Sequence, residues 1–245
     1  MKEGQGRIDN QQFPQGEIDT TKDGVTLTLL SQVSYRPFGG VQSYLNSQGQ
    51  AYTRGFDLDG RITSYTLNNQ VQAISYDAAN RIISINQVNN TNRQATYGYD
   101  TLDRLTSYLT PQTSQSFTYD PVGNRNTQTT GAATTTYSYG STSNRLTQVA
   151  GSQTNAVAMD ANGSTTNNGV AQFTYDTRGR MLTATTAAGV VQYQINALGQ
   201  RVQKSSPTAS TLYHYDMSGK LISEASGTTS VDYVYLDDIP VAVLK

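Results

Sequence analysis

The stretch Phe173–Ser205, "FTYDTRGRMLTATTAAGVVQYQINALGQRVQKS", contains nearly the same phrase twice. Tyr175-Asp-x-x-Gly-Arg180 returns 20 residues later as Ile195-Asn-x-x-Gly-Gln-Arg201. Such a phrase can repeat because a ligand site is copied along the chain, or because a backbone turn is copied. The choice between these explanations decides which class of protein the sequence describes.

The phrase extends over most of the chain. Its second member falls at Asp57, Asp77, Asp100, Asp120, Gly140, Asp160, Asp176, Asn196, Asp216 and Leu236. The intervals are 20, 23, 20, 20, 20, 16, 20, 20 and 20 residues. Because seven of these nine intervals are identical, the chain is a tandem array of about ten copies, and repeats with such a period indicate a repeat architecture.

Each phrase has the chemistry of a tight turn. An aspartate at the first position can bond its side chain to backbone amides further round the turn, and a glycine three residues later accepts a positive φ. Asn80 and Asp103 replace that glycine in two copies, and both types tolerate the left-handed region. The predicted structural turn residues are Asp57, Gly60, Asp77, Asp100, Asp120, Gly123, Asp160, Gly163, Asp176, Gly179, Asp216 and Gly219.

The flanks of each turn alternate as strands do. Aromatic pairs such as Tyr97 and Tyr99 lie two residues apart, which places both on one face of a strand. Each copy therefore predicts a β-hairpin, and the array predicts an all-β fold of roughly 20 strands paired edge to edge. Open sheets rarely exceed about ten strands without curling, so we expect a coiled, spiral ribbon with tyrosine rows on one face.

The composition favours sheet and excludes several functions. Of 245 residues, 14% are charged, 17 are tyrosine and none is cysteine or tryptophan; abundant aromatic and threonine residues suit pleated sheet. A net charge of −1 without a Lys/Arg cluster argues against nucleic acid as a partner. Without cysteine there are no disulfides or thiolate metal sites. The sequence contains no run of 18 apolar residues and no signal peptide, so we expect no membrane span.

The repeats resemble the YD repeat of bacterial Rhs (rearrangement hotspot) proteins, which are related to the shell of teneurins. The resemblance covers about Tyr35 to Lys245 and includes Tyr119-Asp-Pro-Val-Gly-Asn-Arg125 and the closing Tyr233-Val-Tyr-Leu-Asp-Asp-Ile-Pro240. It implies a β-ribbon that forms part of a hollow shell. It also implies that such a shell encloses a C-terminal toxin, so the toxin cargo of a larger protein is an expected partner.

The sequence departs from the family pattern at several points. The Tyr139-Gly140 copy lacks the aspartate, and the copy around Met159 is four residues short. The Asp-Pro-x-Gly-Leu motif that the family associates with self-cleavage does not occur. We expect this chain to be part of a wall within a longer extracellular or cell-surface protein.

The chain divides into two predicted parts. Residues 1–34 form a polar lead-in in which 25–30 alternate and could add an edge strand, and 35–245 form the YD-repeat domain. Unpaired sheet edges favour further pairing. Other repeats of the same protein, or self-association through the sheet edges, are therefore expected as partners.

No pattern indicates catalysis, a cofactor or a metal site. His214 is the only histidine and, by alternation, faces away from Tyr213 and Tyr215. The aspartates recur once per hairpin, which suits turn capping better than calcium binding or paired catalytic carboxylates. Arginines follow the turns, where pairing with aspartate or stacking on tyrosine is the favoured role over binding a polyanion. They are Arg61, Arg81, Arg104, Arg125, Arg145, Arg180 and Arg201.

Three functions follow, in order of support. The first is a non-enzymatic structural scaffold that encloses and helps deliver a toxin. The second is a carbohydrate or cell-surface binding module, in which exposed aromatic rings stack on sugars. The third, an enzyme, has no nucleophile–base pair, metal cluster or cofactor loop behind it. The candidate glycan-stacking residues are Tyr97, Tyr99, Tyr119, Tyr175 and Tyr215.

Overall fold

The chain is built of antiparallel β-strands. The computed structural model describes residues 18–22, 25–37, 39–237 and 239–245. Over these residues the only helix is the 3-10 turn η1 (Thr91–Arg93). The expected all-β class is confirmed. None of the described helical structure is long and apolar enough to cross a membrane.

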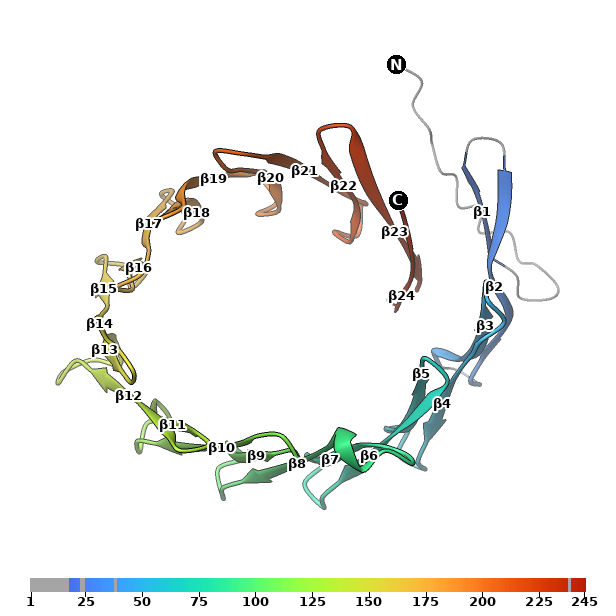
Figure 1. Cartoon of the computed structure of the whole chain (residues 1–245), viewed down its shortest axis with the longest axis horizontal. Helices are drawn as coiled ribbons and strands as arrows, with labels where there is room; N and C mark the ends of the chain where they lie inside the picture. Colours follow the sequence, from blue (N-terminus) through green and yellow to red (C-terminus); the bar gives the residue numbers. More distant parts are fainter. Residues whose placement is uncertain (1–17, 23–24, 38, 238) are drawn as a thin grey trace. The chain divides into compact units, whose positions relative to one another are not determined.

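The strands pair in the order of the sequence, as two sheets (Figure 1). The first sheet has 14 strands: β1 (Ile18–Lys22), β2 (Val25–Tyr35), β3 (Val41–Asn46), β4 (Ala51–Phe56), β5 (Ile62–Leu67), β6 (Gln70–Tyr76), β7 (Ile82–Gln87), β8 (Gln94–Tyr99), β9 (Leu105–Leu109), β10 (Ser114–Tyr119), β11 (Arg125–Thr130), β12 (Ala133–Tyr139), β13 (Leu146–Ala150) and β14 (Thr154–Ala156). The second has 10 strands: β15 (Ala158–Met159), β16 (Thr165–Asn167), β17 (Gln172–Tyr175), β18 (Met181–Thr186), β19 (Gly189–Ile195), β20 (Arg201–Ser205), β21 (Ser210–Tyr215), β22 (Leu221–Ser226), β23 (Thr229–Leu236) and β24 (Ile239–Leu244).

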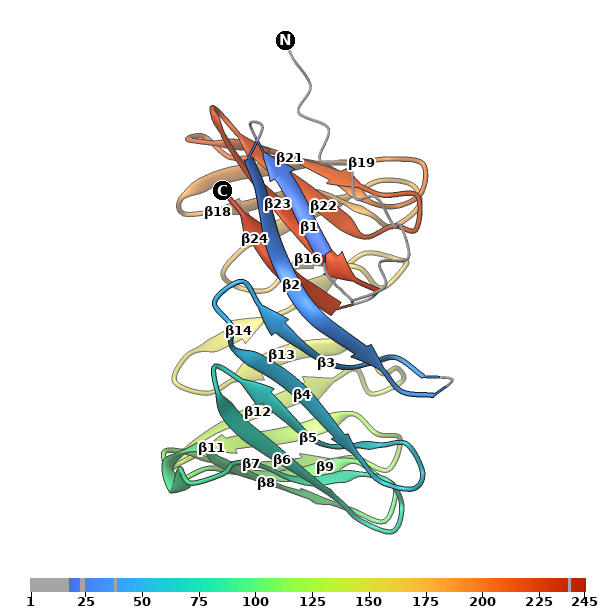
Figure 2. The same ribbon diagram turned by 90° about the vertical axis from the view of Figure 1, so that its right-hand side faces the viewer.

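The chain divides into two compact units, Met1–Gln115 and Ser116–Lys245. In the described part of the first unit, β2 pairs with β1 on one side and β3 on the other (Figure 2). The segment expected as an edge strand is therefore an inner strand, because Ile18–Lys22 adds a further strand outside it. The rest of the expected lead-in, residues 1–17, lies outside the described residues.

The second unit contains a short-stranded segment. Strands β14 to β17 have three, two, three and four residues, whereas β18 to β24 have five to eight. The two sheets meet in sequence at Val157, whose backbone N–H donates to the carbonyl oxygen of Thr147 at 2.8 Å. The copy that is four residues short in the sequence is thus the one with the least sheet pairing.

The two faces of the strands differ in residue type. Tyr97 of β8 is opposite Tyr108 of β9, and on the other face Gly98 is opposite Ser107. A Cβ on Gly98 would lie 2.4 Å from the Ser107 hydroxyl oxygen, so this glycine makes room for its cross-strand partner. In the second unit, the hydroxyls of Thr174 and Thr183 are 2.7 Å apart across β17 and β18. One face carries the large aromatic side chains and the other carries small hydroxyl residues.

The buried core is small. Eight apolar side chains are buried among the described residues: Leu29, Leu30, Val41, Tyr44, Ala184, Tyr213, Val234 and Leu236. Strands pack mainly against the strands before and after them in the chain. Since a large core is not available to hold the hairpins together, the contacts between successive copies carry much of the remaining stabilisation.

Candidate functional site: the repeat turns

The aspartate that begins each turn organises the turn backbone. Asp77 accepts hydrogen bonds at Oδ1 from the N–H groups of Ala79 (2.9 Å) and Arg81 (3.0 Å), and at Oδ2 from Arg81 Nε (2.7 Å). Asn80, three residues after Asp77, has a φ of 64°. We call Asp77 the turn acid, Arg81 the closing residue and Ile82 the acceptor residue, and use these names for the first, fifth and sixth positions of every copy.

The same arrangement recurs at the other predicted turn aspartates. Their Oδ1 atoms accept from the N–H of the closing residue at 2.8–3.0 Å in the copies of Asp57, Asp100, Asp120, Asp160, Asp176 and Asp216. The third residue after the turn acid has a positive φ at Gly60, Asp103, Gly123, Gly163, Gly179 and Gly219. The predicted turn residues thus all lie at hairpin turns, in the conformation that the phrase requires.

These hydrogen bonds favour the ionised form of Asp77, Asp100, Asp176 and Asp216. Backbone N–H groups, first that of the closing residue, lower the pKa of Asp77, Asp100 and Asp176 below the ordinary value of 3.8, and the closing arginine side chains act in the same direction. At Asp216 the Ser218 hydroxyl is the largest cause of a lowered pKa. The carboxylates therefore act as fixed acceptors at neutral pH.

In six copies, the tyrosine before the first position of the turn joins its copy to the preceding copy. Tyr99 donates its hydroxyl to the carbonyl oxygen of Ile82, the acceptor residue of the preceding turn, at 2.7 Å. The Arg81 guanidinium lies over the same ring, with Cζ 4.8 Å from its centroid. The other tyrosine hydroxyls that bond to an acceptor residue at 2.7–3.0 Å are those of Tyr76, Tyr139, Tyr175, Tyr215 and Tyr235.

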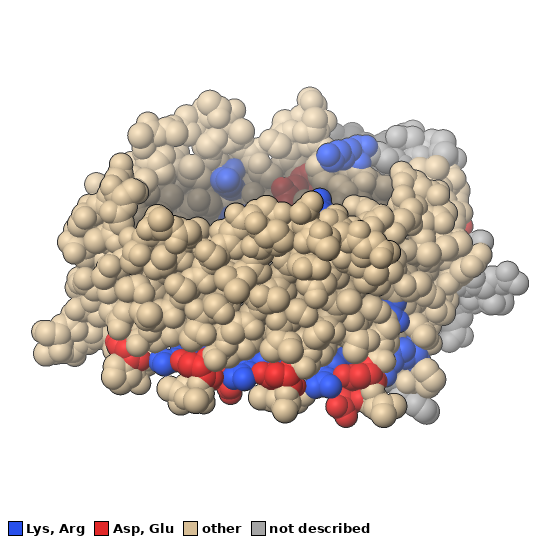
Figure 3. Space-filling model, turned by 60° about the horizontal axis from the view of Figure 1, so that its bottom comes forward, with Lys and Arg blue, Asp and Glu red and all other residues tan. Residues whose placement is uncertain are grey.

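The closing residue also reaches the next turn. Arg81 Nη1 donates to the Asp100 carbonyl oxygen (3.2 Å) and to Asp103 Oδ1 (2.6 Å). In the second unit, Arg180 Nη1 donates to the Asn196 carbonyl oxygen at 2.7 Å. Figure 3 shows the resulting row, in which basic and acidic side chains alternate along one edge. Four of the arginines that follow the turns pair with the acid of their own turn, and these are Arg61, Arg81, Arg104 and Arg180. Arg125 and Arg201 stack on tyrosines, and Arg145 donates to the carbonyl oxygens of Asp160 and Ala161.

The candidate glycan-stacking tyrosines fall into two groups. Tyr99, Tyr175 and Tyr215 belong to the turns, where their hydroxyls are bonded as above, and Tyr119 is half-buried at the same position before Asp120. Tyr97 is different, because its ring lies against Tyr108 with centroids 5.5 Å apart. Both rings line a groove of about 470 Å³ together with Gln72, Gln94, Gln112 and five other residues. Burial raises the pKa of Tyr97, and the neighbouring Tyr108 adds to that effect.

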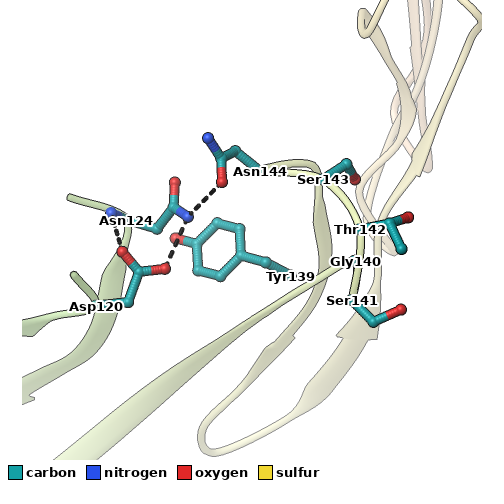
Figure 4. Close-up of a pocket in the computed structure, with 8 residues that line it drawn as sticks. All are labelled: Asp120, Asn124, Tyr139, Gly140, Ser141, Thr142, Ser143 and Asn144. Atoms are coloured by element: carbon teal, nitrogen blue, oxygen red, sulfur yellow. Dashed lines mark hydrogen bonds between the residues drawn. The ribbon is translucent and has the colours of Figure 1, made fainter. Parts of the chain in front are cut away.

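One cavity breaks the regular arrangement of the turns (Figure 4). It has about 420 Å³ and lies between the turn that starts at Asp120 and the turn that starts at Gly140. Here the closing residue is Asn124, whose Nδ2 donates to Asp120 Oδ2 (2.8 Å) and to Asn144 Oδ1 (3.1 Å). The turn at Gly140 is one residue longer than the others, since the Gly140 N–H donates to the Arg145 carbonyl oxygen.

The sequence analysis did not predict this cavity, although an alignment of the copies shows two departures from the pattern at this place. Residue 124 is the first closing position after Arg61, Arg81 and Arg104 that lacks an arginine, and residue 140 lacks the acid. His214 is exposed and lies on the face opposite the buried Tyr213. Within the described parts of the chain, no group of three or more His, Asp or Glu residues could hold a metal ion.

Hairpins that are bonded copy to copy through their turns define a tandem repeat protein. The chain belongs to the teneurin YD-shell family, a family of structural shells that matches residues 2–205. The expected resemblance to that family is thereby confirmed. No curated protein matches the chain.

Two solved structures share the fold. A chain of the Photorhabdus luminescens Tc holotoxin pore matches with a TM-score of 0.69 and 16% identity, over 90% of this chain and 13% of that one. A chain of TcdB2-TccC3 matches with a TM-score of 0.56 and 15% identity, over 90% of this chain and 14% of that one. This chain therefore covers only 13–14% of the length of these two chains.

Proposed function

We propose that this chain is a section of the wall of a YD-shell that encloses a toxin as cargo within a larger protein. The observation that carries the proposal is the repeated link between copies, in which the tyrosine of one hairpin bonds to the acceptor residue of the hairpin before it. Such links suit a wall that extends by adding copies, and the family match supports the same role. A structural role of this kind requires no catalytic group, cofactor or metal.

The two sheets are proposed to curl into a spiral. Support comes from their size. Open twisted sheets rarely exceed about ten strands without curling or flattening; one of these sheets has 14 strands and the other has 10. A flat strip of 24 strands would be on the order of 115 Å long. Small-angle X-ray scattering of the chain should give a maximum dimension well below that length, and a dimension near that of the flat strip would exclude the spiral.

Containment is tested on the longer protein. We expect the native reading frame to continue into further YD repeats and a variable C-terminal segment, and we expect the whole protein to be exported. Limited proteolysis of that protein should leave the C-terminal segment intact while the same segment, expressed alone, is digested. Equal digestion rates, or a reading frame without further repeats, would rule out the proposed containment.

The outer strands are proposed to pair with further copies. Among the described strands, β1 is the first of one sheet and β24 the last of the other, and each pairs there with one strand; a sheet edge of this kind can accept a further strand. In this chain on its own, sedimentation velocity should show self-association that increases with concentration. A monomer at all concentrations, with β1 and β24 protected from hydrogen exchange, would contradict pairing through these edges.

A second candidate function is carbohydrate binding at the groove of Tyr97 and Tyr108. The observation in its favour is the combination of two tyrosine rings with the amide side chains of Gln72, Gln94 and Gln112, which can stack on and hydrogen-bond to a sugar ring. Tyrosine fluorescence should change when polysaccharide is added, and Tyr97→Ala should abolish the change. A Tyr97→Ala variant that responds like the unmodified chain would remove this candidate.

A further inference from the structure

The cavity beside Asp120 occupies the place where a guanidinium group lies between other turns. In the copy of Asp77, Arg81 Nε contacts Asp77 Oδ2 at 2.7 Å, and its Cζ lies 4.8 Å from the centroid of Tyr99. Its Nη1 also donates to the carbonyl oxygen of Asp100 at 3.2 Å. A carboxylate, an aromatic ring and a turn carbonyl thus surround one guanidinium.

The same three groups line the cavity of the second unit. Asp120 supplies the carboxylate, Tyr139 the ring and Gly140 the first residue of the next turn. The closing residue is the neutral and shorter Asn124, and no lysine or arginine lines the cavity. The following arginine is committed elsewhere, because Arg125 Cζ lies 4.4 Å from the centroid of Tyr137.

We propose that this cavity binds a guanidinium group, carried either by an arginine side chain of a partner polypeptide or by free arginine. A planar guanidinium can donate to the Asp120 carboxylate, lie on the Tyr139 ring and donate to turn oxygens at once, which an ammonium group does less well. Asn144 Oδ1, now 3.1 Å from Asn124 Nδ2, adds an acceptor at the far side. The site does not depend on the proposed shell function.

The test uses the side-chain amide signals of Asn124 and Asn144 in the NMR spectrum of the whole chain. Nα-acetyl-arginine amide is the probe, and Nα-acetyl-citrulline amide is its neutral counterpart of the same shape. The arginine probe should shift both amide signals saturably, and the citrulline probe should leave them in place. Equal shifts with both probes would overturn the proposal. A stronger effect of the blocked probe than of free L-arginine would assign the site to a polypeptide, and the reverse would assign it to free arginine.

The matched variant restores the missing side chain. Asn124→Arg should fill the cavity. The dissociation constant of the arginine probe, measured from the Asn144 signal, should rise at least tenfold, while signals far from the cavity remain unchanged. The reciprocal variant Arg81→Asn should open an equivalent cavity between the turns of Asp77 and Asp100 and create a second set of probe-dependent shifts there. Undiminished binding by Asn124→Arg would overturn the proposal, whatever the reciprocal variant does.

Discussion

The copies from Asp57 to Arg104 and the copies from Gly140 to Asn167 follow one plan with different completeness. The first group has an aspartate and an arginine in every turn, and its strands β5 to β8 have six or seven residues. The second group lacks the acid at Gly140 and has Ser164 as a closing residue, and its strands have two to five residues. The interruption of the sheet, between β14 and β15, falls in the second group. In these two groups, complete turns and long strands occur together.

The largest expected effect is a difference in unfolding free energy between variants of Tyr99, whose ring is stacked on a closing arginine, and of Tyr139, whose ring is not. Tyr99→Ala removes a ring that stacks on Arg81 and a hydroxyl that bonds to Ile82, and should cost about 2 kcal/mol of unfolding free energy for this half-buried side chain. Tyr139→Ala loses the corresponding hydroxyl bond to Arg125 but no stacked closing arginine, so it should cost less. Urea unfolding of both variants provides the comparison, and equal losses would show that the stacked arginine adds nothing.

Local opening should differ between the two groups of copies. Amide hydrogen exchange in β15 and β16 should be at least tenfold faster than in β6 and β7, after correction for intrinsic rates, which corresponds to a difference of about 1.4 kcal/mol in opening free energy. The reason is that β15 and β16 are short strands that form few ladder hydrogen bonds. Uniform protection across both groups would mean that turn links and strand length do not set local stability.

Low pH should reduce the difference in hydrogen-exchange protection between the two groups of copies. Asp77 and Asp100 have a lowered pKa in the folded chain, so their contribution to stability is fully present above the unfolded value near 3.8 and is lost as the pH falls through the lower folded value. Gly140 has no carboxylate to protonate. Exchange measured from pH 6 down to below 3.8 should therefore show protection falling faster in the copies of Asp77 and Asp100. A parallel decline in both groups would contradict a role for the turn acids.

The smallest expected effect comes from completing a turn. Ser164→Arg introduces a closing arginine after Asp160, which can pair with that carboxylate and reach the next turn as Arg180 does. Exposed ion pairs contribute little, so the midpoint of thermal unfolding should rise only slightly, with slower exchange in β15 and β16. Ser164→Gln, which is long but uncharged, is the control. If the control raises stability as much as the arginine, charge is not what the short copy lacks.

The sequence predicts the turns and the class of fold, but it predicts only part of the candidate site. The spacing of Asp77, Asn80 and Arg81 predicts the hairpin turn, because the conformation depends on those residues alone. The bond from Tyr99 to the Ile82 carbonyl depends on how two copies pair, and local sequence does not encode that distance. The expectation of an edge strand at residues 25–30 was wrong because the strand outside it, Ile18–Lys22, has few apolar residues to mark it.

The tyrosine bond between copies has a consequence for how such walls can vary. In the six bonds of this kind given above, the acceptor is a main-chain oxygen, so the bond itself does not depend on the side chain of the acceptor residue. The acceptor residues in these bonds are Ile62, Ile82, Arg125, Thr165, Arg201 and Leu221, a set that spans aliphatic, hydroxyl and cationic types. The bond between hairpins is thus compatible with different side chains at the acceptor position, and the repeat can keep its links while its sequence varies there.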